Sequence, residues 1–170
     1  MSAEELHRSA ADVVSLLISR GETVAAAESC TGGGILSALT SVPGSSAAVW
    51  GGIVSYANEA KIHLLDVDPA LLESSGAVSE GVAKAMAWGA MTRSGADRTV
   101  AVTGIAGPGG GTPDKPVGTV WIAWYDPIEK LSAKLFRFEG DRDAVREQAV
   151  MEALEGLRRQ LDRKPKASLY

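Results

Sequence analysis

In the first twenty residues of the chain, apolar residues recur at the spacing of a helix. Ser2 and Glu5 match a capping box, and apolar side chains then follow every three or four residues until Gly21 ends the pattern. Four later segments show the same spacing, and Asn58 and Ser79 stand where two of them would be capped. These four helices are predicted over residues 32–39, 58–65, 79–94 and 141–161.

Between the helices lie shorter apolar runs that are rich in small and β-branched residues, a composition typical of buried strands. Strands that alternate with helices favour a parallel sheet, but the last two runs follow each other without a helix and predict an antiparallel pair. The expected fold is therefore an α/β protein, a three-layer α/β/α sandwich around a mixed sheet of about five strands. The strands are predicted over residues 23–27, 47–56, 99–102, 117–125 and 131–138.

The chain has 170 residues, which suits one layered domain. We expect this domain to span residues 1–162 and to be followed by a solvated tail at 163–170. Residues 104–118, GIAGPGGGTPDKPVG, form a connection too long for an ordinary turn and are interpreted as an active-site loop.

Composition and charge narrow the function. A net charge of -4 argues against the broad basic face that nucleic acids or anionic membranes require. One cysteine and two separated histidines predict neither a disulfide nor a metal site. The sequence has neither a signal-peptide pattern nor a run of about 18 apolar residues, so we expect a cytoplasmic protein without a membrane span.

The turn after the first predicted strand, Ser29-Cys30-Thr31-Gly32-Gly33, offers two nucleophiles at the edge where α/β proteins bind ligands. The glycines match neither a dinucleotide-binding motif nor a P-loop. They would either admit an anion or oxyanion to free backbone N–H groups or let the helix pack closely on the sheet. Ser29 would act as a nucleophile or as an N-cap, and Cys30 is the rival nucleophile.

A serine nucleophile needs a base, and Lys61 is the leading candidate. In the first turn of its predicted helix, the positive end of the helix dipole disfavours an ammonium, and partial burial would act in the same direction. A neutral amine can then take the proton of Ser29. Tyr56, at the end of the preceding strand, could donate a hydrogen bond to Ser29 or relay a proton to a leaving group. A surface lysine and an amphipathic ring at the sheet edge are the alternative interpretations.

Arg142 and Arg146 lie four residues apart at the start of the last predicted helix and therefore share one face. Two guanidinium groups beside the positive end of a helix suit a phosphate or a carboxylate. Salt bridges to neighbours such as Asp143 and Glu147 are the alternative. The pair is a candidate anion site.

Four stretches together resemble the CinA C-terminal domain family. They are AESCTGG at 27–33, SYANEAK at 55–61, TGIAGPGGG at 103–111 with KPVGTVW at 115–121, and GDRDAVR at 140–146. The similarity extends over nearly the whole chain, from the first helix to about residue 160, and the four stretches show no departure from the family pattern. Characterised members of this family are nicotinamide-mononucleotide (NMN) amidohydrolases of the PncC type.

The resemblance implies a three-layer α/β/α fold with a mixed five-stranded sheet. It also implies hydrolysis of the NMN carboxamide to nicotinic acid mononucleotide and ammonia, without a metal or other cofactor. Ser29 is then the nucleophile, with Lys61 and Tyr56 as its acid–base partners. The remaining site residues follow by the same comparison: Thr31, Gly32, Gly33, Thr103, Gly104 and Gly107 would line the substrate pocket, and Arg142 with Arg146 would serve the phosphate or ribose.

Two alternatives stay open. One is a non-catalytic module that binds NMN or a related pyridine nucleotide as a sensor, and the other is a hydrolase that acts through Cys30. Family members tend to associate, so we expect a homo-oligomer, in the simplest case a dimer, with a small-molecule substrate. In many relatives the domain follows a larger N-terminal domain linked to competence or DNA damage.

Overall fold

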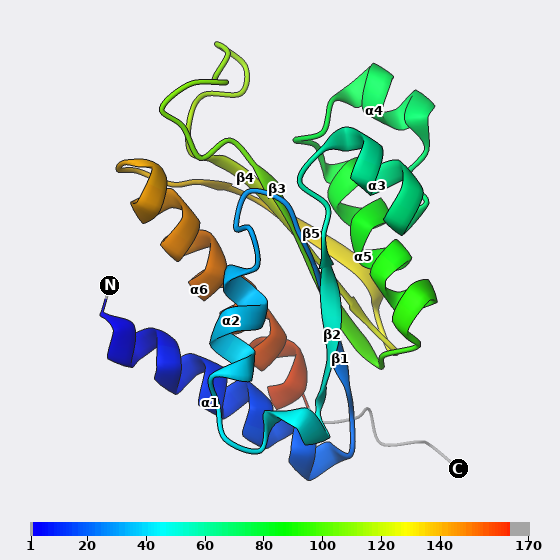
Figure 1. Ribbon diagram of the computed structural model, residues 1–170, viewed down its shortest axis with the longest axis vertical. Coiled ribbons are helices and arrows are strands. Elements are labelled where there is room, and N and C mark those ends of the chain that lie inside the picture. The colour runs from blue at the N-terminus through cyan, green and yellow to red at the C-terminus, as the bar shows by residue number, and fades with distance from the viewer. Residues whose placement is uncertain (1, 164–170) are drawn as a thin grey trace.

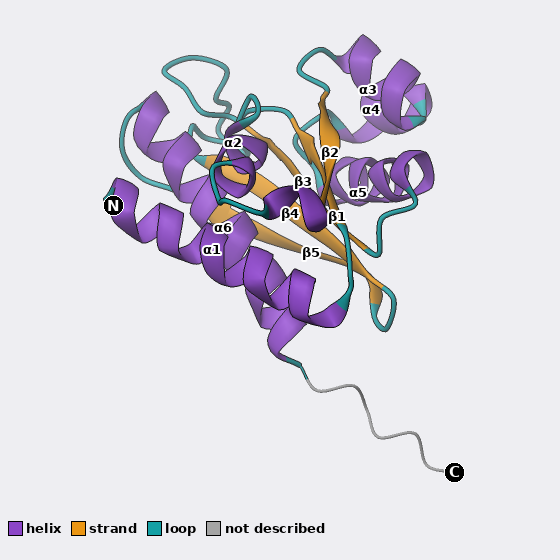
Figure 2. Cartoon of the chain, turned by 60° about the horizontal axis from the view of Figure 1, so that its bottom comes forward, coloured by secondary structure: helices purple, strands orange, loops and turns teal. Residues whose placement is uncertain are grey.

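The computed structural model describes residues 2–163 and has three layers, a twisted central sheet with helices on both faces (Figure 1, Figure 2). One face is covered by α1 (Ala3–Arg20), α2 (Gly34–Thr40) and α6 (Arg142–Asp162), and the other by α3 (Asn58–Leu65), α4 (Pro69–Ser75) and α5 (Glu80–Ser94). A 3-10 turn, η1, lies at Ser45–Ala47. No helix within the described range combines the length and apolar character needed to cross a membrane. Residues 164–170 of the predicted tail lie outside this range.

The sheet has five strands in the order β2-β1-β3-β4-β5. β1 (Val24–Glu28) is parallel to both of its neighbours, β2 (Val49–Val54) and β3 (Arg98–Gly104). β4 (Thr119–Asp126) pairs antiparallel with β3, and β5 (Lys130–Arg137) pairs antiparallel with β4. The α/β sandwich and its mixed sheet are therefore confirmed, including the antiparallel final pair.

β1 is buried along its whole length because it lies between two strands and between both helical layers. Its side chains are small. Val24 and Ala26 belong to the apolar core beneath α1, α2 and α6, and Ala27 belongs to the core beneath α5. Small side chains let the helices on both faces pack close to the strand. The strand then ends at Glu28, a charged side chain that is fully buried.

Local signals in the sequence account for most helix starts. Ser2 and Glu5 form the expected capping box of α1, and the Ser79 hydroxyl accepts a backbone N–H of α5. The cap expected of Asn58 is wrong. Ala57 holds the extended N-cap position of α3, and Asn58 is already the first helical residue. α3 thus begins one residue earlier than expected, and the extended stretch after β2 is one residue shorter.

α4 is missing from the sequence-based prediction because seven residues are too few to show a helical period. Its start nevertheless carries a local signal, with Asp68 as N-cap and Pro69 at the first helical position. α2 also differs from the prediction, since it begins at Gly34 rather than at Gly32. The residues just before α2 form the turn that carries the candidate chemistry.

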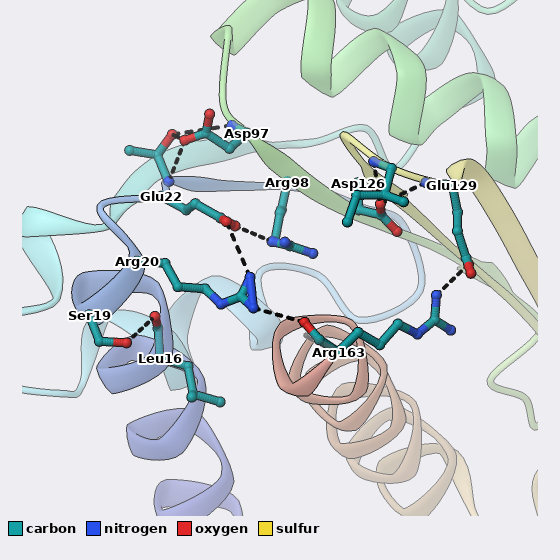
Figure 3. A network of polar contacts seen from close by, with 11 residues as sticks. Leu16, Ser19, Arg20, Glu22, Asp97, Arg98, Asp126, Glu129 and Arg163 are labelled. Carbon is teal, nitrogen blue, oxygen red and sulfur yellow. Dashed lines mark hydrogen bonds and ion pairs between the residues drawn. The ribbon is translucent and has the colours of Figure 1, made fainter. Parts of the chain in front are cut away.

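At the amino-terminal end of the parallel strands, charged side chains connect α1, β3 and α6 (Figure 3). Glu22 pairs with Arg98, whose side chain is 2% exposed, and lies 3.5 Å from Arg20. Arg20 also donates to the backbone carbonyl of Arg163 at 2.9 Å, and Arg163 pairs with Glu129 in the β4–β5 turn. This network closes the end of the sheet that lies opposite the candidate site.

Candidate active site

The three parallel strands end at one edge of the sheet, where a pocket of about 200 Å³ opens. The loop between β3 and β4 extends beyond the same edge (Figure 1). Residues of α3 and of the segment before α5 complete the walls. Six of the predicted site residues line this pocket: Ser29 after β1, Tyr56 after β2, Thr103 and Gly104 at the end of β3, Lys61 in α3 and Arg142 in α6.

Lys61 reaches back from α3 and contacts Ser29. Its Nζ lies 3.0 Å from Ser29 Oγ and donates to the backbone carbonyls of Ser55 at 2.8 Å and Tyr56 at 3.3 Å. The Lys61 side chain is almost completely buried, at 1% exposure. This burial lowers the pKa of the Lys61 ammonium below its ordinary value. The structure therefore brings the predicted nucleophile and the predicted base into contact.

The geometry around Lys61 limits what its amine can do. Lys61 is the fourth residue of α3, and helical side chains lean toward the N-terminus, so Nζ reaches the carbonyls just before the helix. Carbonyl oxygens only accept hydrogen bonds, so two N–H groups of the amine point at them. The remaining position on Nζ points toward Ser29. In the ammonium it carries a third N–H, and in the neutral amine it carries the lone pair.

Of the two roles expected of the Tyr56 hydroxyl, the hydrogen bond to Ser29 is not formed, and the proton relay to a leaving group stays a prediction. The side chain of Tyr56 is 62% exposed, and its hydroxyl accepts a hydrogen bond from Arg142 Nη2 at 3.1 Å. The hydroxyl is thus engaged at the rim of the pocket rather than with Ser29. The direct contact of Tyr56 with the Ser29–Lys61 pair is made by its backbone carbonyl.

Arg142 and Arg146 share a helix face but reach different places. Arg142 Nη1 donates to the carbonyl of Gly107 at 2.8 Å, beside the Ser29 pocket. Arg146 donates from Nε to the carbonyl of Cys30 at 3.1 Å and from Nη2 to that of Thr31 at 3.3 Å. Arg146 and Thr31 line a separate hollow of about 510 Å³ between α1, α2 and α6. Contrary to the expectation, the two guanidinium groups do not converge on one anion site.

Glu28 is a residue of the site that the sequence reasoning missed. Its buried carboxylate accepts four hydrogen bonds from the segment that follows it. The available signal was a glutamate at the end of a run of alanines in a buried strand. A carboxylate in such a place requires hydrogen-bond partners. The four donors are Thr31 Oγ1 at 2.6 Å, the N–H groups of Gly33 and Ile35 at 3.1 Å, and that of Leu36 at 2.9 Å.

The glycine turn is therefore not an open cradle for an anion. The N–H groups of Gly32, Gly33 and Gly34 all donate to acceptors of the turn or to Glu28, at 3.0 or 3.1 Å. The N–H groups of Cys30 and Thr31, in contrast, have no acceptor from another residue in the described part of the chain. The Cys30 N–H contacts its own thiol, so these two amides, unlike those of the glycines, are not held by another residue of the turn.

Cys30 lies beside Ser29 but in an environment unsuited to a nucleophile. Its side chain is only 6% exposed. Burial, together with the nearby Glu28 carboxylate, raises the pKa of the Cys30 thiol to about 12. Because the thiolate is the reactive form, this environment favours Ser29 over Cys30 as the nucleophile.

Comparison with known proteins identifies relatives over most of the chain. The profile of a protein family described as the CinA C-terminal domain matches residues 6–161. A CinA-like protein from Synechocystis sp. is 53% identical over 152 residues, which cover 88% of this chain and 36% of that protein. A CinA-like protein from Chlorobaculum tepidum is 54% identical over 149 residues, 85% of this chain and 35% of that protein. The chain thus spans about a third of the length of these relatives.

Solved structures show the same fold. The competence/damage inducible protein CihA from Agrobacterium tumefaciens has a TM-score of 0.90 at 42% identity, covering 94% of this chain and 96% of that chain. A competence-damaged protein (CinA) superfamily protein from Enterobacter cloacae has a TM-score of 0.88 at 33% identity, with 92% of each chain covered. By sequence and by structure, the chain belongs to the CinA C-terminal domain family.

Proposed function

We propose that this chain hydrolyses the carboxamide of NMN to nicotinic acid mononucleotide and ammonia, with Ser29 as nucleophile and Lys61 as its base. The observation that carries the proposal is the contact of 3.0 Å between Lys61 Nζ and Ser29 Oγ inside a pocket. A buried lysine with a lowered pKa next to a serine is the arrangement that serine hydrolysis without histidine requires.

The reaction follows from the hydrogen-bond directions at the amine. With its two N–H groups on the carbonyls of Ser55 and Tyr56, the neutral amine of Lys61 turns its lone pair toward Ser29. Ser29 Oγ attacks the carboxamide carbon while its proton passes to Nζ. Nζ then gives the proton to the amide nitrogen, and the C–N bond breaks. Ammonia departs, and the acyl group remains bound to Ser29 Oγ as an ester. Water then attacks this ester by the same route, releasing the carboxylic acid and the Ser29 hydroxyl.

The negative oxygen that forms during each attack needs hydrogen-bond donors. We propose the N–H groups of Cys30 and Thr31 for this role, because no other residue in the described part of the chain accepts a hydrogen bond from them. The N–H of the residue after a serine nucleophile performs the same task in α/β-hydrolases, an analogy that supports the assignment. Arg146 holds the carbonyl of Cys30, so the trans peptide directs the N–H of Thr31 away from Arg146.

The pocket suits one part of the proposed substrate. A volume of about 200 Å³ accommodates a pyridine ring with its carboxamide, between Thr103 and Lys61, while ribose and phosphate must extend past the rim. Arg142 and the Tyr56 hydroxyl lie at that rim. We therefore propose Arg142, without Arg146, as the guanidinium that meets the phosphate.

The first test is turnover by purified, chelator-treated protein. We expect ammonia and nicotinic acid mononucleotide in equal amounts from NMN, and neither from nicotinamide or nicotinamide riboside. Ser29→Ala should lower kcat at least about 10³-fold, since the nucleophile is lost. Ser46→Ala, a change of an exposed serine in η1, is the matched control and should retain full activity.

Other results would assign the chain to one of the alternatives. Saturable NMN binding by calorimetry without turnover would contradict the enzyme proposal and support a sensor. Inactivation by iodoacetamide at pH 8 would support a cysteine mechanism. We expect no inactivation, because a thiol pKa of about 12 leaves roughly one thiolate in 10⁴ molecules at that pH.

A further inference from the structure

The Glu28 carboxylate has no part in the proposed chemistry, yet it is the most completely enclosed charge next to Ser29. Its side chain is 0% exposed, and it occupies the last position of β1, immediately before the nucleophile. A buried carboxylate is costly unless hydrogen bonds satisfy it. What the carboxylate is bonded to therefore indicates why it is there.

All four donors to Glu28 come from the eight residues that follow it. Oε2 accepts from the hydroxyl of Thr31 and from the N–H groups of Gly33 and Ile35, while Oε1 accepts from the N–H of Leu36. Three of these donors are backbone groups at the start of α2, whose N-cap, Gly33, has no side chain to cap it. Glu28 thus caps the helix from the preceding strand and complements the positive end of the helix.

Arg146 holds the same turn from the other side. It donates to the carbonyls of Cys30 and Thr31, so an anion binds the N–H groups of the segment and a cation binds its carbonyls. Gly32 and Gly33, with φ of 58° and 99°, allow the chain to wrap around the carboxylate. The turn is fixed between two opposite charges, and Ser29 is its first residue.

We propose that Glu28 is a positioning residue: its buried carboxylate fixes the turn from Ser29 to Gly33 so that the Ser29 hydroxyl meets Lys61 and the N–H groups of Cys30 and Thr31 stay free for the substrate. The catalytic consequence rests on the proposed function, whereas the structural one does not. The carboxylate also occupies the place that an external phosphate would take at the glycine turn, which directs the phosphate to another part of the pocket.

Glu28→Gln keeps the size of the side chain and removes its charge. A carboxylate accepts all four bonds, but an amide turns an NH₂ donor toward at least one N–H of the turn. The turn must then shift, and a displacement of about 1 Å at a nucleophile costs on the order of 100-fold in rate. We expect kcat for NMN to fall about 100-fold while KM stays within about three-fold, because the pocket walls at Thr103 and Arg142 are not touched.

Two readouts separate positioning from general loss of stability. Leu157→Ala, in α6 and 0% exposed, is the matched control, because a core truncation of this kind lowers the melting temperature without touching the turn. When rates are compared per folded molecule, Leu157→Ala should have the same kcat as the unchanged protein. Amide hydrogen exchange followed by NMR should be at least about 10-fold faster at Ile35 and Leu36 in Glu28→Gln than in the unchanged protein. Wild-type kcat or unchanged exchange in Glu28→Gln would overturn the proposal.

A second variant keeps the test valid if Glu28→Gln does not fold. Thr31→Val leaves the carboxylate in place and removes only the 2.6 Å bond from the hydroxyl. We expect a smaller fall in kcat, about five-fold, with faster exchange at Gly33, and unchanged values of both would contradict the proposal. If the unchanged protein does not hydrolyse NMN, the enzyme proposal fails, but exchange at Ile35 and Leu36 still tests the role of Glu28.

Discussion

Lys61 has an amine surrounded by two backbone carbonyls and one hydroxyl, and none of its contacts is a carboxylate. Burial is the largest influence on the amine and lowers its pKa, while the neighbouring Cys30 acts in the opposite direction. The neutral form is then populated at a lower pH than in a solvated lysine. Because the proposed mechanism uses this neutral form, activity must rise with pH as Lys61 loses its proton.

This argument gives a prediction for the pH profile. We expect kcat/KM for NMN to increase along one limb whose apparent pKa lies below the ordinary lysine value of 10.5. Lys61→Arg keeps a cation that donates hydrogen bonds but cannot release a proton near neutral pH, so it should lower kcat about 10³-fold. Rates measured between pH 6 and 10 test both statements.

The matched control is Lys84→Arg, at a lysine of α5 that pairs with Glu80 on the surface and should leave the profile unchanged. A limb at the pKa of a solvated lysine would contradict the role of burial. Full activity of Lys61→Arg would remove Lys61 from the proton transfer.

At the scale of elements, the first two turns of α6 perform two separate tasks. Arg142 contacts Gly107 and Tyr56 at the rim of the pocket, whereas Arg146 holds the turn before α2. Only Arg142 should therefore distinguish ligands with a phosphate from those without. We expect Arg142→Met to weaken binding of nicotinic acid mononucleotide about 10- to 100-fold, in line with the loss of a charge-assisted hydrogen bond. Binding of nicotinic acid riboside, which has no phosphate, should stay nearly unchanged.

Calorimetry with both ligands measures this preference directly. Arg146→Met is the matched control, since it removes an arginine four residues away and should preserve the preference for the phosphate-bearing ligand. Equal loss of that preference in both variants would support the single anion site that the spacing of the two arginines suggested.

The same elements show how far the sequence alone could predict this protein. Helix and strand positions follow from short-range patterns, so the five strands and the capping box at Ser2 were predictable. The contact of Ser29 with Lys61 could be anticipated because both follow the ends of parallel strands. The pairing of Tyr56 with Arg142 could not, because it joins residues 86 positions apart and depends on how α6 docks. The role of Glu28 was hidden for a related reason, since its four donors converge on the carboxylate only once the turn and the start of α2 have formed.

At the scale of the whole molecule, the two ends of the sheet differ in chemistry. The carboxyl-terminal end of the parallel strands holds the buried lysine and the pocket, while the other end is closed by the ion network of Arg20, Glu22, Arg98, Glu129 and Arg163 (Figure 3). This network joins the end of α1 to β3 and α6, elements that are distant in the sequence. Damage to it should lower stability without altering turnover.

Glu22→Gln tests this separation of stability from activity. The change leaves the guanidinium of Arg98, only 2% exposed, without its negative partner; because Glu22 is itself 21% exposed, the loss of this partly buried pair costs about 2 kcal/mol. For a chain of this size, each kcal/mol corresponds to about 2–4 °C, so the melting temperature should fall by roughly 4–8 °C. At 25 °C, kcat and KM for NMN should equal those of the unchanged protein.

Glu4→Gln, which breaks an exposed pair with Arg8, is the matched control and should shift the melting temperature by no more than about 2 °C. An unchanged melting temperature in Glu22→Gln would show that the buried pair contributes nothing to stability, and a loss of kcat in the folded variant would show that the two ends of the sheet are coupled.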